Sequence, residues 1–490
     1  MYPTLEEVKA IGTSDSYGRI PVCEELYADA YTPVGLLKTL KEVSHHCYLL
    51  ESAEDNHRWG RYSFLGYDPA MEITCTDGLL RVREGSAVRE KKVEHPKEAL
   101  REILRQYRSP VLEGLPPFTG GLVGYFSYDY IQYAEPVLRQ EGLKEDDFRD
   151  MDLMLFDRVI AFDHYRQKVI LIAGADPAKL PESYEQAGEQ LKAMKELLQK
   201  GSQAVSVRLK LKENMRHRYS KGEYCRMVEK AKQYIHEGDI FQVVLSNPME
   251  ARAEGSLLDT YRVLRTTNPS PYMFYFSSDD IEIAGASPET LAKLENGRLS
   301  TFPLAGTRPR GQTPEEDEAL EKELLADEKE LAEHNMLVDL GRNDIGRISR
   351  IGSVKVEKYL SIERFSHVMH IGSTVTGQIR EDRDAADAID AILPAGTLSG
   401  APKLRACEII RELEGHKRGI YGGAIGYLDF AGNMDTCIAI RLVYLKNGRV
   451  CVRSGAGIVA DSVPEQEFNE CANKAKAVIR ALEEAQGGLE

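Results

Sequence analysis

The sequence predicts an α+β fold of strand-rich antiparallel sheets packed together, with helices on the outside. Runs of β-branched and aromatic residues alternate with polar residues through the N-terminal third, which is typical of antiparallel strands. Long strands recur later without the regular strand–helix alternation of a doubly wound sheet. Because 490 residues exceed the roughly 250–300 at which one core stops growing, we expect two intimately associated domains, at 1–205 and 215–485.

The elements follow in order along the chain. In the first domain the alternation predicts strands at 45–52, 61–68, 120–129, 153–164 and 168–175. A polar segment with helical periodicity, 181–201, is the expected connector. The second domain is expected to hold a helix at 224–238, strands near 240–246, 272–276 and 299–305, and an acidic helix at 314–340. A strand meander at 419–460 and a helix at 464–485 complete the order.

Composition and charge exclude several classes of protein. With 42% hydrophobic and 29% charged residues the chain is neither collagen-like nor disordered, and no apolar run is long enough to span a membrane. A net charge of −15 disfavours nucleic acid or an anionic membrane as a general partner. The start lacks a secretory signal, and the eight cysteines form no CxxC pair. We therefore expect a cytoplasmic protein with reduced cysteines.

Two predicted helices each carry a Glu-x-x-Glu pair, Glu330 with Glu333 and Glu467 with Glu470. Such carboxylates suit Mg²⁺, which prefers oxygen ligands. Acids early in a helix also complement its dipole, and the first pair lies in an acid-rich segment. Ser462 and Glu465 are a candidate capping box, so the second pair is not needed as a cap. Spacing alone leaves metal binding and solvation both open.

Arg441 lies in a predicted strand, CIAIRLVYL, where a buried guanidinium needs an anionic partner. That partner is either an internal carboxylate or a substrate carboxylate. Glycine-rich segments lie beside predicted strands at 393–403, 421–427 and 454–462. The last joins a strand to a helix, so its backbone N–H groups are candidates for binding an anion, with ordinary turns as the alternative. No dinucleotide or P-loop motif is present.

Histidines and one further acid complete the candidates. His367 and His370 form an HxxH pair, but the segment is predicted as a strand, where such residues point to opposite faces, so we reject a paired zinc site. His370 by itself is a candidate catalytic residue, although a lone strand histidine is more often structural. Glu289 follows a proline at a strand end, a suitable place for a general acid.

Ordered motifs across residues 215–480 resemble the chorismate-utilising enzymes. They are GDIFQVVLS, NPSPYMFY, GASPE, PLAGTRPRG, EHNMLVDLGRND, VMHIGSTV, PAGTLSGAPK, RGIYGGAIGY, AIRL and SGAGIVADSVPEQEFNE. LLES (49–52), RYSFLG (61–66) and GGLVGYFSYD resemble the N-terminal region of the same family. Within the family the resemblance is to the members that form anthranilate, in the first committed step of tryptophan biosynthesis.

Two positions discriminate between reactions within this family. Members that add water to chorismate carry a lysine base where this chain has Gln242, and an amide cannot deprotonate water. Members that form aminodeoxychorismate carry a nucleophilic lysine where this chain has Ala305. The resemblance therefore implies a Mg²⁺-dependent lyase that takes free ammonia and chorismate to anthranilate and pyruvate.

The resemblance also implies a role for each candidate residue. Glu333 and Glu470 would bind Mg²⁺, supported by Glu330 and Glu467. Glu289 would protonate the departing C4 hydroxyl, and His370 with Thr397 would assist the loss of pyruvate. The remaining residues would bind substrate, the last five of them at its enolpyruvyl carboxylate: Gly306, Thr307, Arg308, Arg441, Tyr421, Gly455, Ala456 and Gly457.

Partners and regulation follow from the same resemblance. The chain shows no GxCxGxQ glutaminase motif, so a separate glutamine amidotransferase subunit is expected to supply ammonia. L-tryptophan is the expected feedback inhibitor, acting as an allosteric ligand that favours a less closed arrangement of the domains. Its pocket would comprise Glu51, Ser52, Pro271, Tyr272 and Met273.

Two alternatives remain at this stage. The first is the large component of an aminodeoxychorismate synthase in the folate pathway, which shares the fold and differs in product. The second is an acidic binding or scaffold protein whose carboxylates only solvate helices. The second alternative leaves Arg441 without an explanation.

Overall fold

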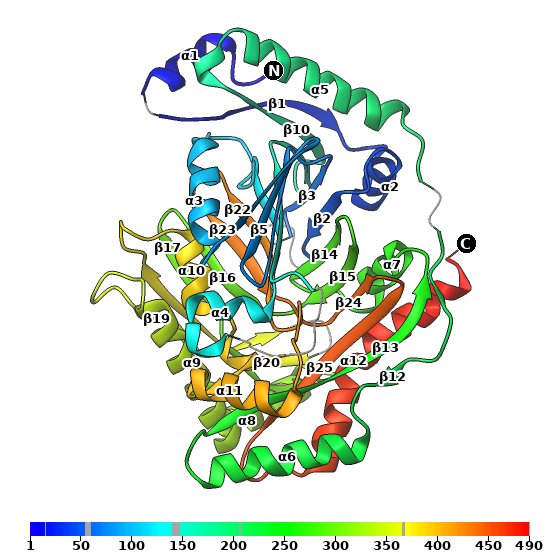
Figure 1. Ribbon diagram of the computed structural model, residues 1–490, viewed down its shortest axis with the longest axis vertical. Coiled ribbons are helices and arrows are strands. Elements are labelled where there is room, and N and C mark those ends of the chain that lie inside the picture. The colour runs from blue at the N-terminus through cyan, green and yellow to red at the C-terminus, as the bar shows by residue number, and fades with distance from the viewer. Residues whose placement is uncertain (15, 54–59, 140–147, 205–206, 365–367, 490) are drawn as a thin grey trace.

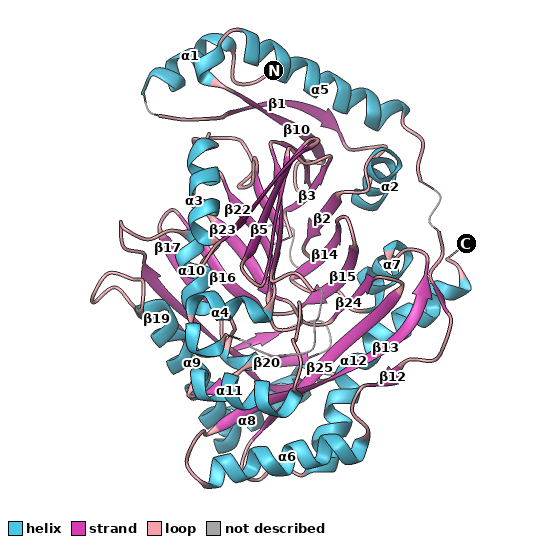
Figure 2. Ribbon diagram, in the orientation of Figure 1, coloured by secondary structure: helices cyan, strands magenta, loops and turns pink. Residues whose placement is uncertain are grey.

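The computed structural model describes residues 1–490 except 15, 54–59, 140–147, 205–206, 365–367 and 490 (Figure 1). Two large antiparallel sheets organise these residues, and helices lie outside them (Figure 2). The predicted fold class is confirmed.

The first sheet has 13 strands among the described residues. In spatial order they are β1 (Ile20–Tyr27), β10 (Lys168–Ala175), β9 (Arg158–Asp163), β3 (Tyr62–Tyr67), β2 (Cys47–Glu51), β14 (Tyr272–Ser277), β15 (Ile281–Ser287), β24 (Leu442–Lys446), β25 (Arg449–Ile458), β13 (Gln242–Glu254) and β11 (Lys210–Leu211), with β12 (Arg216–His217) and β21 (Gly400–Ala401) also paired to β13.

The second sheet has 12 described strands. Their order is β18 (Leu304–Pro309), β20 (Val368–Gln378), β17 (Arg298–Thr301), β16 (Thr290–Glu295), β23 (Met434–Ile438), β22 (Ala424–Asp429), β7 (Gly121–Phe126), β8 (Met151–Phe156), β4 (Met71–Thr76), β5 (Leu79–Glu84) and β6 (Ala87–Lys92), with β19 (Lys355–Arg364) paired to β20. Each sheet thus combines strands from 1–205 with strands from 215–485. The domain boundary stays a prediction, and residue 205 is outside the described residues.

Twelve α-helices occur in the described chain. They are α1 (Leu5–Ser14), α2 (Pro33–Val43), α3 (Lys97–Gln106), α4 (Ile131–Ala134), α5 (Glu182–Lys200), α6 (Lys221–His236), α7 (Leu258–Thr267), α8 (Pro314–Ala326), α9 (Glu328–Gly346), α10 (Ala385–Ile392), α11 (Lys403–Glu414) and α12 (Pro464–Gly487). Helices α2, α5, α7 and α12 share a core with the first sheet, and α3, α9 and α10 share one with the second. Local chemistry starts these helices: Ser220 and Glu223, for example, form a capping box on α6.

An aromatic core joins the two sheets. It contains Tyr48 and Phe274 from the first sheet and Tyr125 and Phe156 from the second, all almost completely buried. Tyr48 packs edge-to-face on Phe156, with ring centroids 4.7 Å apart. Because aromatic side chains bury large areas, this contact fixes one sheet on the other.

The chain passes directly from one sheet to the other at three connections that matter here. Asp157 joins β8 to β9, Pro288 and Glu289 join β15 to β16, and residues 439–441 join β23 to β24. The last two connections run side by side, because β15 pairs with β24 and β16 pairs with β23. These two connections carry Glu289 and Arg441.

Two predicted elements are wrong in detail. The segment 153–164 is not one strand, because β8 and β9 belong to different sheets. The sequence marks the bend only by the charged pair Asp157 and Arg158 between two apolar runs. The acidic helix 314–340 is two helices. Asp327 separates them, and its carboxylate accepts hydrogen bonds from the backbone N–H groups of Lys329 and Glu330, which begins α9.

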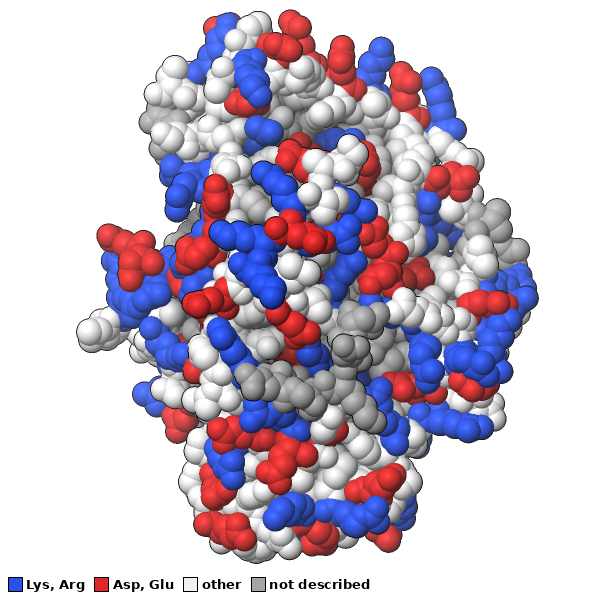
Figure 3. All heavy atoms as spheres, in the orientation of Figure 1, with Lys and Arg blue, Asp and Glu red and all other residues white. Residues whose placement is uncertain are grey.

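Basic and acidic side chains are interspersed over the face shown in Figure 3. No described helix has the length and apolar character needed to cross a bilayer. All eight cysteines are free, and seven of them are buried.

Candidate active site

The site is organised by the two neighbouring connections between the sheets. The backbone N–H of Ile438 donates to the carbonyl oxygen of Glu289 at 2.9 Å, and that of Ala286 donates to the carbonyl oxygen of Arg441 at 3.1 Å. These hydrogen bonds tie together two segments about 150 residues apart in the sequence. The acid and the guanidinium are therefore placed by the junction of the sheets.

Arg441 does not lie within a strand, as the sequence predicted. It lies between β23 and β24 with φ of 54°, a left-handed backbone that costs a residue with a side chain about 1–2 kcal/mol. Its Nη1 donates to the carbonyl oxygen of Lys474 at 2.8 Å. Burial lowers the pKa of Arg441, and within the described residues no carboxylate forms an ion pair with it. The internal partner considered from the sequence is thus not found in that part of the chain.

Glu289 has the properties of a general acid. Burial raises its pKa to about 7, against a smaller opposing effect of the hydrogen bond from Thr397. The Thr397 hydroxyl donates to Glu289 Oε1 at 3.1 Å. A carboxyl group with this pKa is partly protonated near neutral pH and can donate its proton to a leaving group.

A cavity of about 540 Å³ lies beside the two connections. It is lined by most of the predicted site residues and by others that the sequence did not single out: Gln242, Glu289, Ala305, Gly306, Thr307, Lys329, Glu330, Glu333, His370, Thr397, Tyr421, Arg441, Gly455, Gly457, Glu467, Glu470 and Lys474. Long-range pairing brings these residues from ten elements and loops to one place.

Both Glu-x-x-Glu pairs face this cavity, one from α9 and one from α12. Burial raises the pKa of Glu333, and the charge of Glu330 raises it further. Burial also raises the pKa of Glu467, with an added effect of Glu470. Like charges crowded in this way favour a bound cation. The donor set therefore fits Mg²⁺.

Basic residues compensate part of this negative charge. Lys474 Nζ lies 2.6 Å from Glu470 Oε1, one helical turn away. Sequence analysis missed Lys474, although its position four residues after Glu470 is a recognisable ion-pair spacing. The predicted capping box is wrong: α12 begins after Val463, which makes no side-chain cap, and Ser462 Oγ accepts a hydrogen bond from the N–H of Val459.

His370 lies on β20 at the edge of the cavity. Its Nδ1 is 2.8 Å from the carbonyl oxygen of Gly306 and 3.1 Å from the hydroxyl of Thr307. Since a carbonyl oxygen only accepts, Nδ1 donates and the neutral ring carries its lone pair on Nε2. Burial lowers the pKa of His370, which favours this neutral form. His367 is outside the described residues.

The glycine segment 454–462 differs from the predicted loop. Residues 454–458 belong to β25 and pair with β13, Gly455 opposite Ser246 and Gly457 opposite Val244. Both glycines line the cavity, whereas Ala456 between them is buried outside the lining residues described. A Cβ on Gly455 would lie 2.8 Å from the hydroxyl of Tyr421, so only glycine fits beside this side chain.

Arg308 is placed differently from its neighbours Gly306 and Thr307. Its guanidinium lies 2.9 Å from Glu323 and 3.0 Å from Asp327, between β18 and the acidic helices. A longer ion pair of 3.7 Å connects it to Glu330. Arg308 thus contacts the glutamate cluster of the cavity through Glu330.

A second pocket of about 650 Å³ lies between the sheets. All five residues predicted for an allosteric ligand line it: Glu51, Ser52, Pro271, Tyr272 and Met273. The Glu51 carboxylate is held by Arg265 and by the hydroxyl of Tyr261. The Tyr272 hydroxyl donates to Asp435 at 2.9 Å and lies 2.9 Å from the hydroxyl of Thr290, the residue after Glu289.

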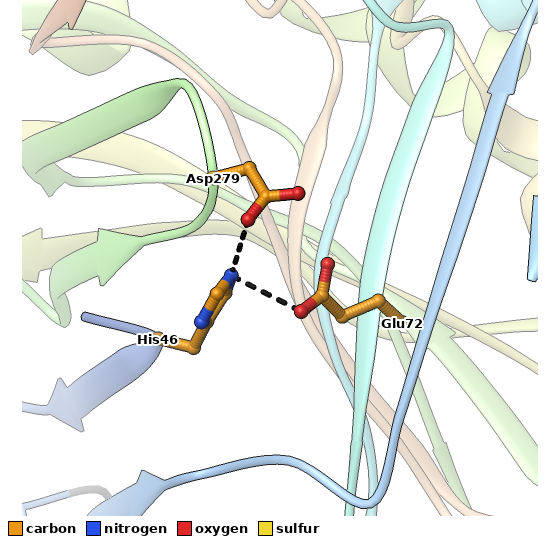
Figure 4. Close-up of side chains that lie close together, drawn as sticks. All are labelled: His46, Glu72 and Asp279. Atoms are coloured by element: carbon orange, nitrogen blue, oxygen red, sulfur yellow. Dashed lines mark hydrogen bonds and ion pairs between the residues drawn. The ribbon is translucent and has the colours of Figure 1, made fainter. Parts of the chain in front are cut away.

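A separate cluster of His46, Glu72 and Asp279 resembles a metal-ligand set (Figure 4). The His46 Nε2 atom lies 3.0 Å from both carboxylates. Arg83 already supplies the positive charge, with Nη2 at 2.9 Å from Asp279 and in contact with Glu72. Because Glu72 and Arg83 come from the second sheet, we interpret this cluster as an ion-pair network that joins the sheets.

Comparison with known proteins identifies the class of protein. The family model described as chorismate binding enzyme matches residues 45–480. The chain therefore belongs to this family of enzymes. The fold agrees: the menaquinone-specific isochorismate synthase from Escherichia coli superposes with a TM-score of 0.70 at 20% identity, covering 98% of both chains.

More similar relatives point to one branch of the family. Anthranilate synthase component 1 from Acetivibrio thermocellus is 48% identical, over 99% of both chains. The enzyme of that name from Aquifex aeolicus is 44% identical, also over 99% of both chains. The crystal structure of anthranilate synthase component I from Streptococcus pneumoniae TIGR4 matches with a TM-score of 0.76 and 41% identity, covering 86% of this chain and 92% of that one. The chain therefore belongs to the branch of the family that comprises anthranilate synthase component 1.

Proposed function

We propose that this chain converts chorismate and ammonia into anthranilate and pyruvate, the first committed step of tryptophan biosynthesis. The observation that carries the proposal is the cavity, which combines a buried acid, an arginine that forms no ion pair with any described carboxylate, and two glutamate pairs. Chorismate is a dianion with a leaving hydroxyl, so it requires these three kinds of group. The names of the similar enzymes support the same assignment.

The carboxylates of the substrate would be held at two places. Glu333 and Glu470, supported by Glu330 and Glu467, would hold Mg²⁺. The chemistry that a bound Mg²⁺ supplies is neutralisation and orientation of the ring carboxylate. Arg441, with Tyr421 and the Gly455–Gly457 segment, would bind the enolpyruvyl carboxylate. Fixing both ends orients the ring, which is often a large contribution to rate.

Proton transfers are assigned to two residues. As ammonia adds at C2, Glu289 protonates the C4 hydroxyl, which leaves as water. His370, neutral and oriented by the Gly306 carbonyl, then assists the loss of pyruvate, with Thr397 close to Glu289. A positioned acid or base typically contributes about 10²–10⁴ in rate.

The ammonia would come from a glutamine amidotransferase subunit in the cytoplasm, since this chain shows no glutaminase motif. L-tryptophan would bind the second pocket and inhibit. The hydrogen bonds from Tyr272 to Asp435 and Thr290 support such a link, because they connect the pocket to the residue beside Glu289. Ala305 lines the cavity, which favours this reaction over aminodeoxychorismate formation by a lysine nucleophile.

The direct test is to mix the purified chain with chorismate, Mg²⁺ and an ammonium salt at mildly alkaline pH. Anthranilate is fluorescent, so its emission should rise with time and should require both Mg²⁺ and ammonium. Formation of non-aromatic aminodeoxychorismate would favour the alternative reaction. Unchanged chorismate under all conditions would refute both.

A further inference from the structure

Gln242 carries a buried acceptor that no described residue satisfies. It is the first residue of β13, lines the cavity, and is 5% exposed. Its Oε1 has no hydrogen-bond partner in the part of the chain that the structure describes. Buried polar groups are nearly always paired, so an orphaned amide oxygen in a ligand cavity indicates a missing donor.

The amide lies against the neighbouring strand β25. A Cβ added at Gly457 would lie 2.7 Å from Gln242 Nε2, so the side chain packs against β25 where only glycine leaves room. The backbone of Gln242 pairs with Ala401 in β21. An acceptor fixed on a strand is better positioned for catalysis than one on a loop.

We propose that Gln242 Oε1 accepts a hydrogen bond from the ammonia molecule that attacks chorismate, which makes Gln242 a catalytic residue; the proposal rests on the function proposed above. Chorismate cannot be the hydrogen-bond donor to Gln242 Oε1. Its carboxylates are acceptors, and the hydroxyl is assigned to Glu289. Ammonia is the remaining donor among the two substrates.

The electrostatics of the step favour an amide at this place. The nitrogen lone pair forms the new C–N bond while the C4–O bond breaks and water leaves with the proton of Glu289. The nitrogen becomes positively charged, and the negative end of the amide dipole stabilises that charge. One proton then leaves the nitrogen and restores Glu289, which balances the step. A lysine here would repel the developing cation.

A surface groove lies next to this end of the cavity. Phe241, directly before Gln242, is 74% exposed and lines an open surface groove of about 750 Å³. A single peptide unit therefore separates the lining of the groove from that of the cavity. Ala401, the backbone partner of Gln242, lines the same groove.

The test compares Gln242→Met, which keeps the length of the side chain and removes the amide, with Gln242→Glu, which keeps an acceptor oxygen. Initial rates are measured with ammonium varied at saturating chorismate and Mg²⁺. We expect Gln242→Met to lower kcat/KM for ammonia about 10–100-fold and to leave chorismate affinity unchanged, because a hydrogen bond to a developing charge is lost. Gln242→Glu should recover part of this loss. Gln233→Leu, which removes an exposed amide from α6 outside the cavity, should leave the ammonia kinetics unchanged.

Chorismate binding in the presence of Mg²⁺ reports whether each variant is folded. A change in chorismate affinity with unaltered ammonia kinetics would overturn the role of Gln242, as would equal rates for all variants. If Gln242→Met does not fold, an undiminished kcat/KM for ammonia in Gln242→Leu overturns it as well. Wild-type chain that forms no product from ammonium would instead refute the proposed function.

Discussion

The cavity beside Glu289 and the second pocket beside Glu51 are lined by neighbouring segments of the chain. They differ in how far their charged side chains are paired with other protein groups. Cys437 lines the second pocket and Ile440, three residues later, lines the cavity. In the second pocket each acid has a protein partner: Arg265 holds Glu51, and Tyr272 donates to Asp435. In the cavity, by contrast, glutamates repel one another and Arg441 has no carboxylate partner among the described residues.

This difference distinguishes two kinds of binding site. Uncompensated charge destabilises an empty site and is relieved by a ligand of opposite charge, so it is retained where ions bind. A pocket with compensated charge binds through shape and hydrogen bonds. The cavity is therefore suited to an anion and a metal ion, and the second pocket to an effector. Five predictions test this contrast, beginning with the largest expected effect.

Glu289→Gln should abolish turnover, with a loss of about 10²–10⁴ in kcat, because the amide cannot donate the required proton. Mg²⁺-dependent binding of chorismate should remain. Anthranilate fluorescence and equilibrium binding measure the two quantities. Loss of binding together with turnover would show that Glu289 holds the substrate instead of acting as its acid.

Arg441→Met should lower kcat/KM for chorismate about 10–150-fold, the usual effect of losing a hydrogen bond to a charged group. The matched control is Arg449→Met, since Arg449 lies at the exposed start of β25 away from both pockets. Equal kinetics for the two variants would indicate that the substrate is not the anion that Arg441 lacks.

Glu467→Gln should weaken Mg²⁺ binding about 10–100-fold, as is typical for residues that support metal ligands. The apparent Mg²⁺ affinity is obtained from rates at saturating chorismate and from calorimetry. Glu483→Gln, on the same helix and outside the cavity, is the control. An unchanged Mg²⁺ affinity would place the metal elsewhere.

Met273→Thr and Ser52→Ala should each raise the tryptophan concentration needed for inhibition by about tenfold, corresponding to about 1.4 kcal/mol. Both residues line the second pocket, so uninhibited activity should persist. Ser202→Ala serves as the exposed control. Tryptophan sensitivity equal to that of the wild type would contradict the assignment of this pocket.

The smallest effect concerns pH and stability. The pKa of Glu289 is raised from 4.5 to about 7, so the native state binds more protons than the unfolded state between these values. Stability should therefore fall as pH rises through this window, by about 1–3 kcal/mol, and Glu289→Gln should remove that loss. Denaturant titrations at pH 5 and 8 measure it. Parallel profiles for the two proteins would show that the carboxyl is not destabilised by burial.

Residue order and local periodicity were sufficient to predict many of the helices and strands and the protein family. The 3.6-residue pattern predicted α5 and α12 within about three residues at each end, and the alternating pattern predicted β2, β3 and β10. The ordered motifs identified the family, because they depend on residue types and not on contacts. These features are local, so they can be obtained without knowledge of the fold.

The position of the site depends on pairings that no local pattern contains. Glu289 and Arg441 meet because β15 pairs with β24 and β16 with β23, across about 150 residues of sequence. The left-handed backbone of Arg441, the burial that raises the pKa of Glu289 and the division of 153–164 between two sheets all follow from that arrangement. Side-chain periodicity specifies which face of an element is buried, but the partner that buries it is selected by packing over the whole chain.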